Sequence, residues 1–439
     1  MTSLNAMLQQ TPYVAYSYSY PHKTAYRVFE QAIPLHDLWT QERRDALFLY
    51  FHVPFCEMRC GFCNLFTTVN HKGDLQTEYL AAFARQAQRI RAALGESTFA
   101  RFAIGGGTPT LLEPDQLHTL FDIAENLFGV DLAQVPISVE TSPKTSEAAK
   151  LQVLRERGVD RISIGVQSFV EAEVAAVGRS QRTMAVEAAL ERIRAAGFPT
   201  LNVDLMYGLP GQTLESWLDS LRAALRFAPE ELYLYPLYVR PLTGLGRQDK
   251  SWDDVRLEYY RAGRDLLRDT GYQQVSMRMF RASHAPALDG PVYCCQEDGM
   301  VGVGCGARSY TQNVHYSNEY AVSSQAVRAI LSEYVTLPDA AFDLASYGVR
   351  LTHEDQRRRY VIQALLQSEG LDLRAYYECF GMDVLEEMPQ LTELLECDLA
   401  TCADGTLVLN DAGMERSDTI GPWLYAAQVC DRMEAFTLL

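Results

Sequence analysis

The chain has 439 residues, 48% of them hydrophobic, which is enough for one large domain and a smaller one with packed cores. Its formal net charge of -17 at pH 7 repels phosphate backbones and excludes a general electrostatic hold on nucleic acid. No apolar run approaches the roughly 20 residues of a membrane span, and the polar N-terminus lacks the layout of a signal peptide, so we expect a globular protein of the cytoplasm with no membrane span.

Residues 1–45 come before the first strand-like run, and we predict that they form an N-terminal arm. The stretch SYSYPHKTAYR, from Ser17 to Arg27, combines aromatic side chains with His22, Lys23 and Arg27. Lys and Arg are natural partners of carboxylates. Arg27 and its neighbours are therefore candidates for binding an acidic small-molecule substrate, with an exposed tether as the plain alternative.

Between Leu47 and Pro236, short apolar runs alternate with segments of helical periodicity. The predicted strands are 47–53, 99–105, 136–141, 161–166, 200–208 and 231–236, with predicted helices between them. Strands that are joined through helices run parallel, because they cannot pair as hairpins. We therefore predict an α/β fold in which residues 46–240 form a partial (β/α)6 barrel of the TIM type.

Three cysteines follow the first predicted strand, in the stretch FCEMRCGFCNLF. Cys56, Cys60 and Cys63 have the spacing C-x3-C-x2-C, and no fourth cysteine stands nearby. Three thiolates hold three irons of a [4Fe-4S] cube, which leaves the fourth iron open to a small molecule. A structural zinc site completed by His52 or His71 is the alternative, although closed zinc sites commonly use paired C-x2-C elements.

Further unusual residues stand at the carboxyl ends of the next strands. They are Gly106, Gly107 and Thr108 in GGGTP after the second strand, Glu140 on the third, Gln167 after the fourth and Asp204 on the fifth. In a barrel of parallel strands the carboxyl ends meet at one face, where reactive groups gather. Topology alone therefore predicts that these residues converge with the cysteines.

Beyond residue 240 the alternation of strands and helices stops. Residues 241–336 hold a helix at 254–271 and the Gly-rich run GMVGVGCGARSY, and we predict that they extend the barrel. Residues 337–439 hold helices at 358–370 and 383–396, a short hairpin at 404–413 and a last helix, an order that resembles a winged-helix module. This part has 19 Asp and Glu against 7 Arg, a balance of -12 (7 - 19), which favours a substrate lid or partner surface over DNA binding.

The cysteine stretch, GGGTP, the strand glutamate, RISIGVQSF and DLMYGLPGQT, in this order, resemble the HemN-like group of radical SAM enzymes. The group includes oxygen-independent coproporphyrinogen III oxidase, its HemW haem-chaperone relatives and the class C radical SAM methyltransferases. The resemblance spans residues 16–316 and is weaker in the C-terminal module. It implies that S-adenosyl-L-methionine binds the open iron of a [4Fe-4S] cluster, where one electron cleaves it to methionine and a 5'-deoxyadenosyl radical.

The resemblance also implies roles for residues around the cluster. Glu140 and the GGGTP segment would bind the methionine part of the cofactor. Gln167, Arg179 and Asp204 match family positions near its adenosine and methionine groups, although Arg179 has the alternative of an ordinary helix-end cation. These residues are the cofactor-binding candidates.

Two residues are the catalytic candidates, and one of them, Tyr50, is also a cofactor-binding candidate. Tyr50, before the cysteine loop, matches a family tyrosine close to the cofactor, and packing in the barrel wall is its alternative. The arm that carries Arg27 would cross the mouth of the barrel near the substrate, as the resemblance to the oxidases implies.

One position departs from the oxidase pattern, because Leu65 stands where those enzymes carry a further cysteine. The departure disfavours a decarboxylase and keeps three functions open. The first is a radical SAM oxidoreductase acting on a tetrapyrrole or similar carboxylated aromatic, and the second is a methyltransferase that uses a second S-adenosylmethionine. The third is a non-catalytic haem-binding chaperone. The two enzymes would need a one-electron donor such as flavodoxin or ferredoxin.

Overall fold

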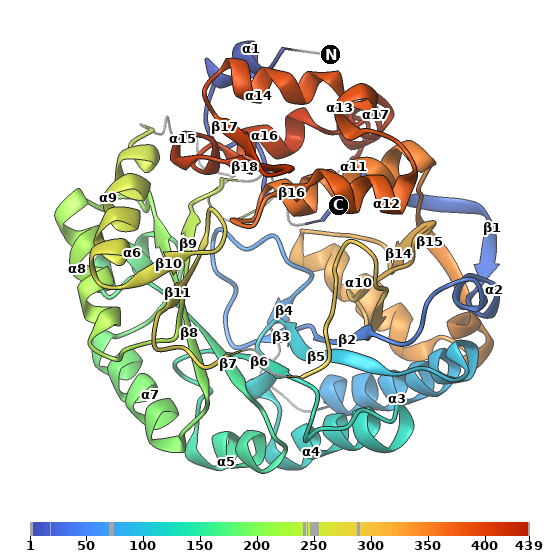
Figure 1. The fold of residues 1–439 in the computed structure, drawn as a ribbon. Coiled ribbons are helices and arrows are strands. Elements are labelled where there is room, and N and C mark those ends of the chain that lie inside the picture. Colours follow the sequence, from blue (N-terminus) through green and yellow to red (C-terminus); the bar gives the residue numbers. More distant parts are fainter. Residues whose placement is uncertain are drawn as a thin grey trace.

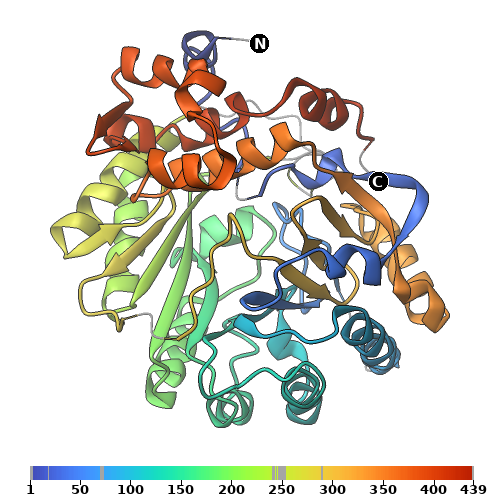
Figure 2. The same ribbon diagram turned by 45° about the vertical axis from the view of Figure 1, so that its right-hand side comes forward.

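The structure, a computed structural model, describes residues 3–17, 19–69, 74–239, 243, 245, 254–287 and 290–437. Its main element is a 13-stranded sheet in the order β1-β15-β14-β13-β12-β2-β5-β6-β7-β8-β9-β11-β10. The sheet curves into an open barrel with helices on its outer side, and the C-terminal helices lie across one end (Figure 1, Figure 2). The predicted boundary at 240–241 lies outside the described residues.

Six parallel strands form the centre of the sheet. They are β2 (Leu47–Val53), β5 (Phe99–Gly106), β6 (Ile137–Thr141), β7 (Arg161–Gln167), β8 (Thr200–Tyr207) and β9 (Glu231–Pro236). Each is hydrogen-bonded in parallel to the next. The six predicted strands and the partial barrel are therefore confirmed.

Helices follow these strands and cover them from outside (Figure 1). They are α3 (Asp74–Leu94), α4 (Pro114–Asp122) continued by a π-helical turn (Ile123–Leu127), α5 (Ala148–Glu156), α6 (Glu171–Ala176), α7 (Thr183–Ala196) and α8 (Leu214–Leu225). Thr213 and Ser216 bond each other's backbone N–H groups in a capping box, which fixes the start of α8. No helix among the described residues is long and apolar enough to cross a membrane.

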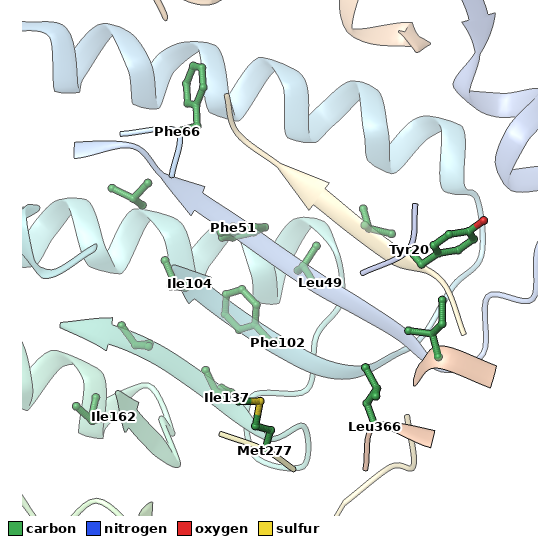
Figure 3. Packing of buried hydrophobic residues seen from close by; sticks show 14 of the residues in the cluster. Tyr20, Leu49, Phe51, Phe66, Phe102, Ile104, Ile137, Ile162, Met277 and Leu366 are labelled. Carbon is green, nitrogen blue, oxygen red and sulfur yellow. The ribbon is translucent and has the colours of Figure 1, made fainter. Parts of the chain in front are cut away.

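The two faces of each central strand have different surroundings. In β2, Leu49 and Phe51 are fully buried and pack with Phe102 and Ile104 of β5 (Figure 3). The alternate residues Phe48, Tyr50 and His52 point to the inside of the barrel, because side chains alternate between the faces of a strand. The helix side therefore supplies the hydrophobic core, and the inside is left for polar groups.

The Gly-rich run forms a strand that the sequence pattern did not predict. This strand, β12 (Met300–Val303), is hydrogen-bonded in parallel to β2 and antiparallel to β13 (Arg308–Tyr310). A side chain at Gly302 would begin only 2.3 Å from the carbonyl oxygen of Arg308. Glycine thus allows the tight return between the two strands.

Further strands complete the sheet on both sides. They are β1 (Arg27–Pro34), β14 (Val314–Ser317) and β15 (Leu344–Arg350) beyond β13, and β11 (Met279–Ala282) and β10 (Tyr272–Gln274) beyond β9. The remaining elements up to β15 are α1 (Leu4–Leu8), a 3-10 turn (Lys23–Ala25), α2 (Leu35–Thr40), β3 (Phe55–Cys56), β4 (Thr68–Val69), a 3-10 turn (Pro109–Leu111), α9 (Arg256–Asp269), α10 (Ser324–Thr336) and a 3-10 helix (Asp339–Asp343). The predicted helix at 254–271 is α9.

The C-terminal part is mostly helical around a small antiparallel sheet in the order β16-β18-β17. Its elements are α11 (His353–Leu365), β16 (Leu371–Asp372), α12 (Leu373–Phe380), α13 (Val384–Glu387), a 3-10 turn (Pro389–Leu391), α14 (Thr392–Glu396), β17 (Ala400–Ala403), β18 (Thr406–Leu409), α15 (Asp411–Met414), α16 (Ser417–Trp423) and α17 (Ala427–Glu434). The prediction of one helix over 383–396 was wrong. Pro389 lacks a backbone N–H and divides the stretch into α13 and α14.

The N-terminal arm runs between the barrel and the C-terminal helices. The N–H of Ala15 donates to the carbonyl oxygen of Asp418 at 3.1 Å, and the hydroxyls of Ser17 and Tyr425 are 2.8 Å apart. Tyr20 is fully buried and donates its O–H to Asp355 at 2.8 Å. These contacts show that the described part of the arm is packed and is not an exposed tether.

Candidate active site

A cavity of about 550 Å³ lies at the carboxyl ends of the central strands, and we call it the thiol pocket. Its lining includes most residues that the sequence predicted for the cluster and cofactor. These are Cys56, Cys60, Cys63, Gly106, Gly107, Thr108, Glu140, Gln167, Arg179 and Asp204. The structure thus brings together side chains from five strand ends, as the topology predicted.

The cysteine loop is tied to neighbouring segments by its backbone. The N–H of Gly61 donates to the carbonyl of Val177 at 2.7 Å, and its own carbonyl accepts from Leu245 at 2.9 Å. A Cβ atom at Gly61 would lie 2.9 Å from the Val177 oxygen, so a larger residue would displace the loop. Short β3 pairs with β4 and fixes the beginning of the loop at Cys56.

The three thiols face one pocket but have different neighbours. Burial raises the pKa of Cys56 to about 12 and also raises the pKa of Cys63. The hydroxyl of Thr67 lies 3.8 Å from the sulfur of Cys63, and Arg179 donates an N–H to the sulfur of Cys60 at 3.4 Å. Because thiolates, not thiols, bind iron, metal binding here would release protons.

The donor set fits a cluster better than a single zinc ion. Among the described residues, no group of three or more His, Cys, Asp or Glu side chains is arranged to hold one metal ion. His52, the zinc alternative, has its Nε2 2.9 Å from the carbonyl of Phe66 and its Nδ1 3.3 Å from the Tyr50 hydroxyl. His71 lies outside the described residues. Three thiols in one large cavity suit the softer and larger iron-sulfur cube.

The glycine segment presents acceptors to the pocket. The N–H of Gly106 donates to the Glu140 carboxylate at 3.0 Å, that of Gly107 to the Val53 carbonyl and that of Thr108 to the Phe55 carbonyl. With its N–H groups used inside the protein, the segment offers oxygen atoms to a ligand. An ammonium group is a donor only, so such a segment fits the amino group of an amino-acid ligand.

Glu140 faces the pocket from β6. Desolvation by the surrounding protein raises the pKa of its carboxyl to about 7, while the N–H of Gly106 lowers it. Asp204 on β8 accepts from the amide of Asn202 at 2.7 Å, and desolvation raises its pKa to about 6. In the described structure neither carboxylate lies within ion-pair distance of a cation. The pocket therefore has two acids available to a cationic ligand.

Gln167 is held in an unusual backbone conformation at the end of β7. Its φ is +72°, and the register between β7 and β8 shifts at this point. A non-glycine residue at positive φ costs free energy of order 1–3 kcal/mol and is found preferentially at functional sites. A Cβ at Gly165 would lie 2.9 Å from the Gln167 amide nitrogen, so the side chain folds back over that glycine.

A second cavity of about 460 Å³ adjoins the first, and we call it the aromatic chamber. Its aromatic lining comes from Phe48, Tyr50, Phe66, Tyr293, Tyr310 and Tyr320. Its cations are Lys23 from the arm, Arg308 from β13 and Arg359 from α11. Both cavities are lined by Lys23, Leu65, Gly106, Glu140 and Arg308, so they adjoin at these residues, which we call the boundary.

Lys23 and Arg359, two of the cations of the chamber, donate to backbone carbonyls. Lys23 is buried, donates to the carbonyl of Asn64 at 3.2 Å and lies 4.0 Å from the ring centre of Tyr320. Arg359 is 8% exposed and donates to the carbonyl of Gln296 at 2.7 Å. No carboxylate of the described chain lies within ion-pair distance of Arg359. Buried cations of this kind favour an anionic ligand.

The two catalytic candidates lie in different places. Tyr50 lines the aromatic chamber and not the thiol pocket. Arg27 lines neither cavity, because its guanidinium donates to the carbonyls of Thr24 and Tyr26 at 2.8 and 2.7 Å. His22 and Lys23 do reach the thiol pocket. The predicted catalytic role of Arg27 therefore has no geometric support, and the arm contributes through these neighbours.

Sequence reasoning missed most of the aromatic chamber. Arg308 and Tyr310 lie in the Gly-rich stretch, which was predicted to extend the barrel without roles for single residues. Tyr293 and Arg359 carried no recognised motif. Arg359 stands in a run of three arginines on a helix, a pattern that predicts a solvent-exposed side chain. Only the fold places this side chain at the chamber.

Comparisons with known proteins agree with this arrangement. The model of the Radical SAM superfamily matches residues 50–224, and the model of the HemN C-terminal domain matches residues 351–415. The chain is 32% identical over 372 residues to the heme chaperone HemW of Bacillus subtilis, covering 83% of this chain and 95% of that protein. It is 28% identical over 433 residues to the oxygen-independent coproporphyrinogen III oxidase of Salmonella typhimurium, covering 91% and 90%.

Among solved structures, coproporphyrinogen III oxidase (HemN) from Escherichia coli, described as a radical SAM enzyme, superimposes with a TM-score of 0.79. The match covers 100% of both chains at 21% identity, which shows a shared fold. The named relatives divide between a chaperone and an oxidase, while the family as a whole implies a [4Fe-4S] cluster and S-adenosylmethionine. On this sequence and structural likeness, the chain belongs to the HemN/HemW family of radical SAM proteins.

Proposed function

We propose that this protein is a radical SAM oxidoreductase that acts on a tetrapyrrole or a similar carboxylated aromatic. The observation that carries the proposal is that the thiol pocket and the aromatic chamber adjoin, with Lys23, Leu65, Gly106, Glu140 and Arg308 lining both. A reaction needs both partners side by side and protected from water. This arrangement supplies one cavity for the cofactors and one for a substrate.

In the thiol pocket, Cys56, Cys60 and Cys63 would bind three irons of a [4Fe-4S] cluster. When bound and reduced, this cluster supplies the electron that cleaves S-adenosylmethionine. Glu140 would accept hydrogen bonds from the amino group of the nucleotide, helped by acceptors of the Gly106 segment. The remaining candidates Gln167, Arg179 and Asp204 would orient its ribose and methionine groups.

In the aromatic chamber, the protein would recognise a flat substrate by its faces and its charges. Rings such as Tyr293 and Tyr310 offer stacking surfaces, and Tyr50 would contact the substrate from β2. Lys23, Arg308 and Arg359 would bind its carboxylates. The oxidase names among the relatives support a carboxylated tetrapyrrole, and a flavodoxin- or ferredoxin-type protein would supply the electron.

Two other functions are each favoured by one observation. Leu65 is 45% exposed at the boundary of the two cavities, where the oxidases carry a cysteine, and this favours a methyltransferase that binds a second S-adenosylmethionine. The 32% identity to heme chaperone HemW favours a haem-handling protein that retains the cluster without turnover. Both functions use the same two cavities.

A single series of anaerobic assays separates these functions. The protein is reconstituted with iron and sulfide, reduced with dithionite and given S-adenosylmethionine, and 5'-deoxyadenosine is measured. Carbon dioxide released from coproporphyrinogen supports the oxidoreductase, and S-adenosylhomocysteine formed with 5'-deoxyadenosine supports the methyltransferase. Stoichiometric haem binding with no 5'-deoxyadenosine would overturn both enzymatic proposals.

A further inference from the structure

Arg179 has a contact that cofactor binding does not explain. Its Nη1 donates to the sulfur of Cys60 at 3.4 Å, its Nη2 to the carbonyl of Gly165 at 2.5 Å and its Nε to the amide oxygen of Gln181 at 2.8 Å. Gln181 in turn donates to the carbonyl of Val166 at 2.9 Å. All three guanidinium nitrogens are therefore anchored, and the group is fixed against one thiol.

The three cysteines differ in this respect. Cys63 has the neutral hydroxyl of Thr67 at 3.8 Å, and the side chains that hydrogen-bond Cys56 are the hydroxyls of Thr67 and Thr108. Within the described structure, Cys60 is the thiol of the three to which a guanidinium donates. Arg59 also lies near Cys63 and acts on it through its charge, but the direct guanidinium hydrogen bond is the one to Cys60.

We propose that Arg179 raises the reduction potential of the iron-sulfur cluster through its charged N–H bond to the Cys60 sulfur. The inference rests on the proposed function, because it requires that the three cysteines hold a [4Fe-4S] cluster. It is distinct from the predicted contact of Arg179 with the nucleotide, and both roles are compatible, since a guanidinium carries five N–H donors.

The direction of the effect follows from charge. Reduction adds one negative charge to the cluster and increases the electron density on its sulfur ligands. A donor that is positively charged and already oriented stabilises the reduced state more than the oxidised state. Hydrogen bonds to the sulfurs and nearby charge are established determinants of cluster potential. Arg179 would therefore let a milder one-electron donor reduce this cluster.

The test measures the midpoint potential of the reconstituted cluster in the full-length protein, without S-adenosylmethionine, by an anaerobic titration followed by electron paramagnetic resonance. We expect Arg179→Met to lower the midpoint potential by about 59 mV. At a fixed solution potential, the ratio of reduced to oxidised cluster then falls about tenfold, because one electron is transferred. Arg179→Lys keeps the positive charge but lacks the planar, forked guanidinium, and Arg179→Gln keeps an N–H donor without the charge. The midpoint potentials of both variants should lie between those of Arg179→Met and the unchanged protein.

Two matched controls separate a local bond from other effects. Arg182→Met removes the same charge from an exposed position three residues away, and Thr67→Val removes a neutral neighbour of Cys63. Both should shift the potential much less than Arg179→Met does. If the Arg179→Met protein takes up iron and sulfide poorly, Gln181→Leu is the alternative variant. It keeps the charge of Arg179 but removes the bond that holds its Nε, and it should also lower the midpoint potential of the cluster.

A midpoint potential in Arg179→Met equal to that of Arg182→Met, at matched iron and sulfide content, would overturn the inference. Weaker S-adenosylmethionine binding with an unchanged potential would overturn it too, and would leave the proposed function standing. Absence of 5'-deoxyadenosine from the unchanged protein would defeat the proposed function instead, while the potentials of the variants could still be compared.

Discussion

The thiol pocket and the aromatic chamber share five lining residues but are otherwise built largely from different parts of the chain. The pocket takes most of its residues from consecutive strand ends between Cys56 and Asp204, and it holds the three thiols together with acids such as Glu140 and cations such as Arg59 and Arg179. The chamber takes its walls from the arm, from the antiparallel strands β12–β14 and from α11, as in Lys23, Arg308 and Arg359, and it is rich in aromatic rings and cations.

This difference shows how cofactor binding and substrate binding would be divided between the two cavities. A cationic nucleotide and an iron-sulfur cluster call for acids and thiols, which rigid strand ends place with little freedom. The proposed carboxylated substrate would need cations, and Lys23, Arg308 and Arg359 come from segments outside the repeating strand and helix units.

The largest expected effect comes from removing a thiol. Cys60→Ala should abolish 5'-deoxyadenosine formation and lower the iron content, because the cluster loses one of three protein ligands. Cys402→Ala, at an exposed cysteine of the C-terminal part, is the matched control and should leave both unchanged. Full activity of Cys60→Ala would contradict the assignment of this pocket to a cluster.

The next largest effect should come from removing the negative charge of Glu140 in the thiol pocket. Glu140→Gln should weaken S-adenosylmethionine binding roughly 10- to 100-fold, the range for losing a charge-assisted hydrogen bond. Equilibrium binding to the oxidised cluster protein measures it, with Glu156→Gln on the exposed face of α5 as the control. A ligand of the chamber alone should bind Glu140→Gln with little change, which sharpens the comparison of the two cavities.

The pH dependence of nucleotide binding tests the same group without a mutation. Since the pKa of Glu140 is raised to about 7, its carboxylate is present above that pH and is protonated below it. Binding of the cationic amino group should therefore be about tenfold weaker at pH 6 than at pH 8. Glu140→Gln should flatten this dependence, and an equally steep profile in that variant would assign it to another group.

The smallest expected effect concerns the chamber. Arg359→Met should weaken the binding of a porphyrin that carries free carboxylates about fivefold, with no change for its methyl ester. Arg222→Met, at an exposed position on α8, is the control. Equal losses for acid and ester would show that Arg359 acts through packing, and a loss of iron would show that the two cavities are not independent.

Much of the pocket could be predicted because its signals are local. The strand bounds follow from apolar runs that are buried on both faces, as in β7 and β8, and the parallel order follows from the helices between them. Once the order is known, Glu140, Gln167 and Asp204 fall at one end together. The strained φ of Gln167 and the Arg179 contact with Cys60 could not be predicted, since both depend on atomic packing.

By itself, the sequence determined the thiol spacing, the strand and helix alternation and the end of the barrel at which the chemistry gathers, because periodicity and loop position are properties of neighbouring residues. Only the tertiary structure decided that Lys23, Arg308 and Arg359 share one chamber, and that Arg27 lies outside it. These residues are separated by more than 300 positions at the extremes, and their meeting depends on how β12–β15 and α11 close over the barrel. No pattern of neighbouring residues in the sequence predicts that such distant residues line one cavity.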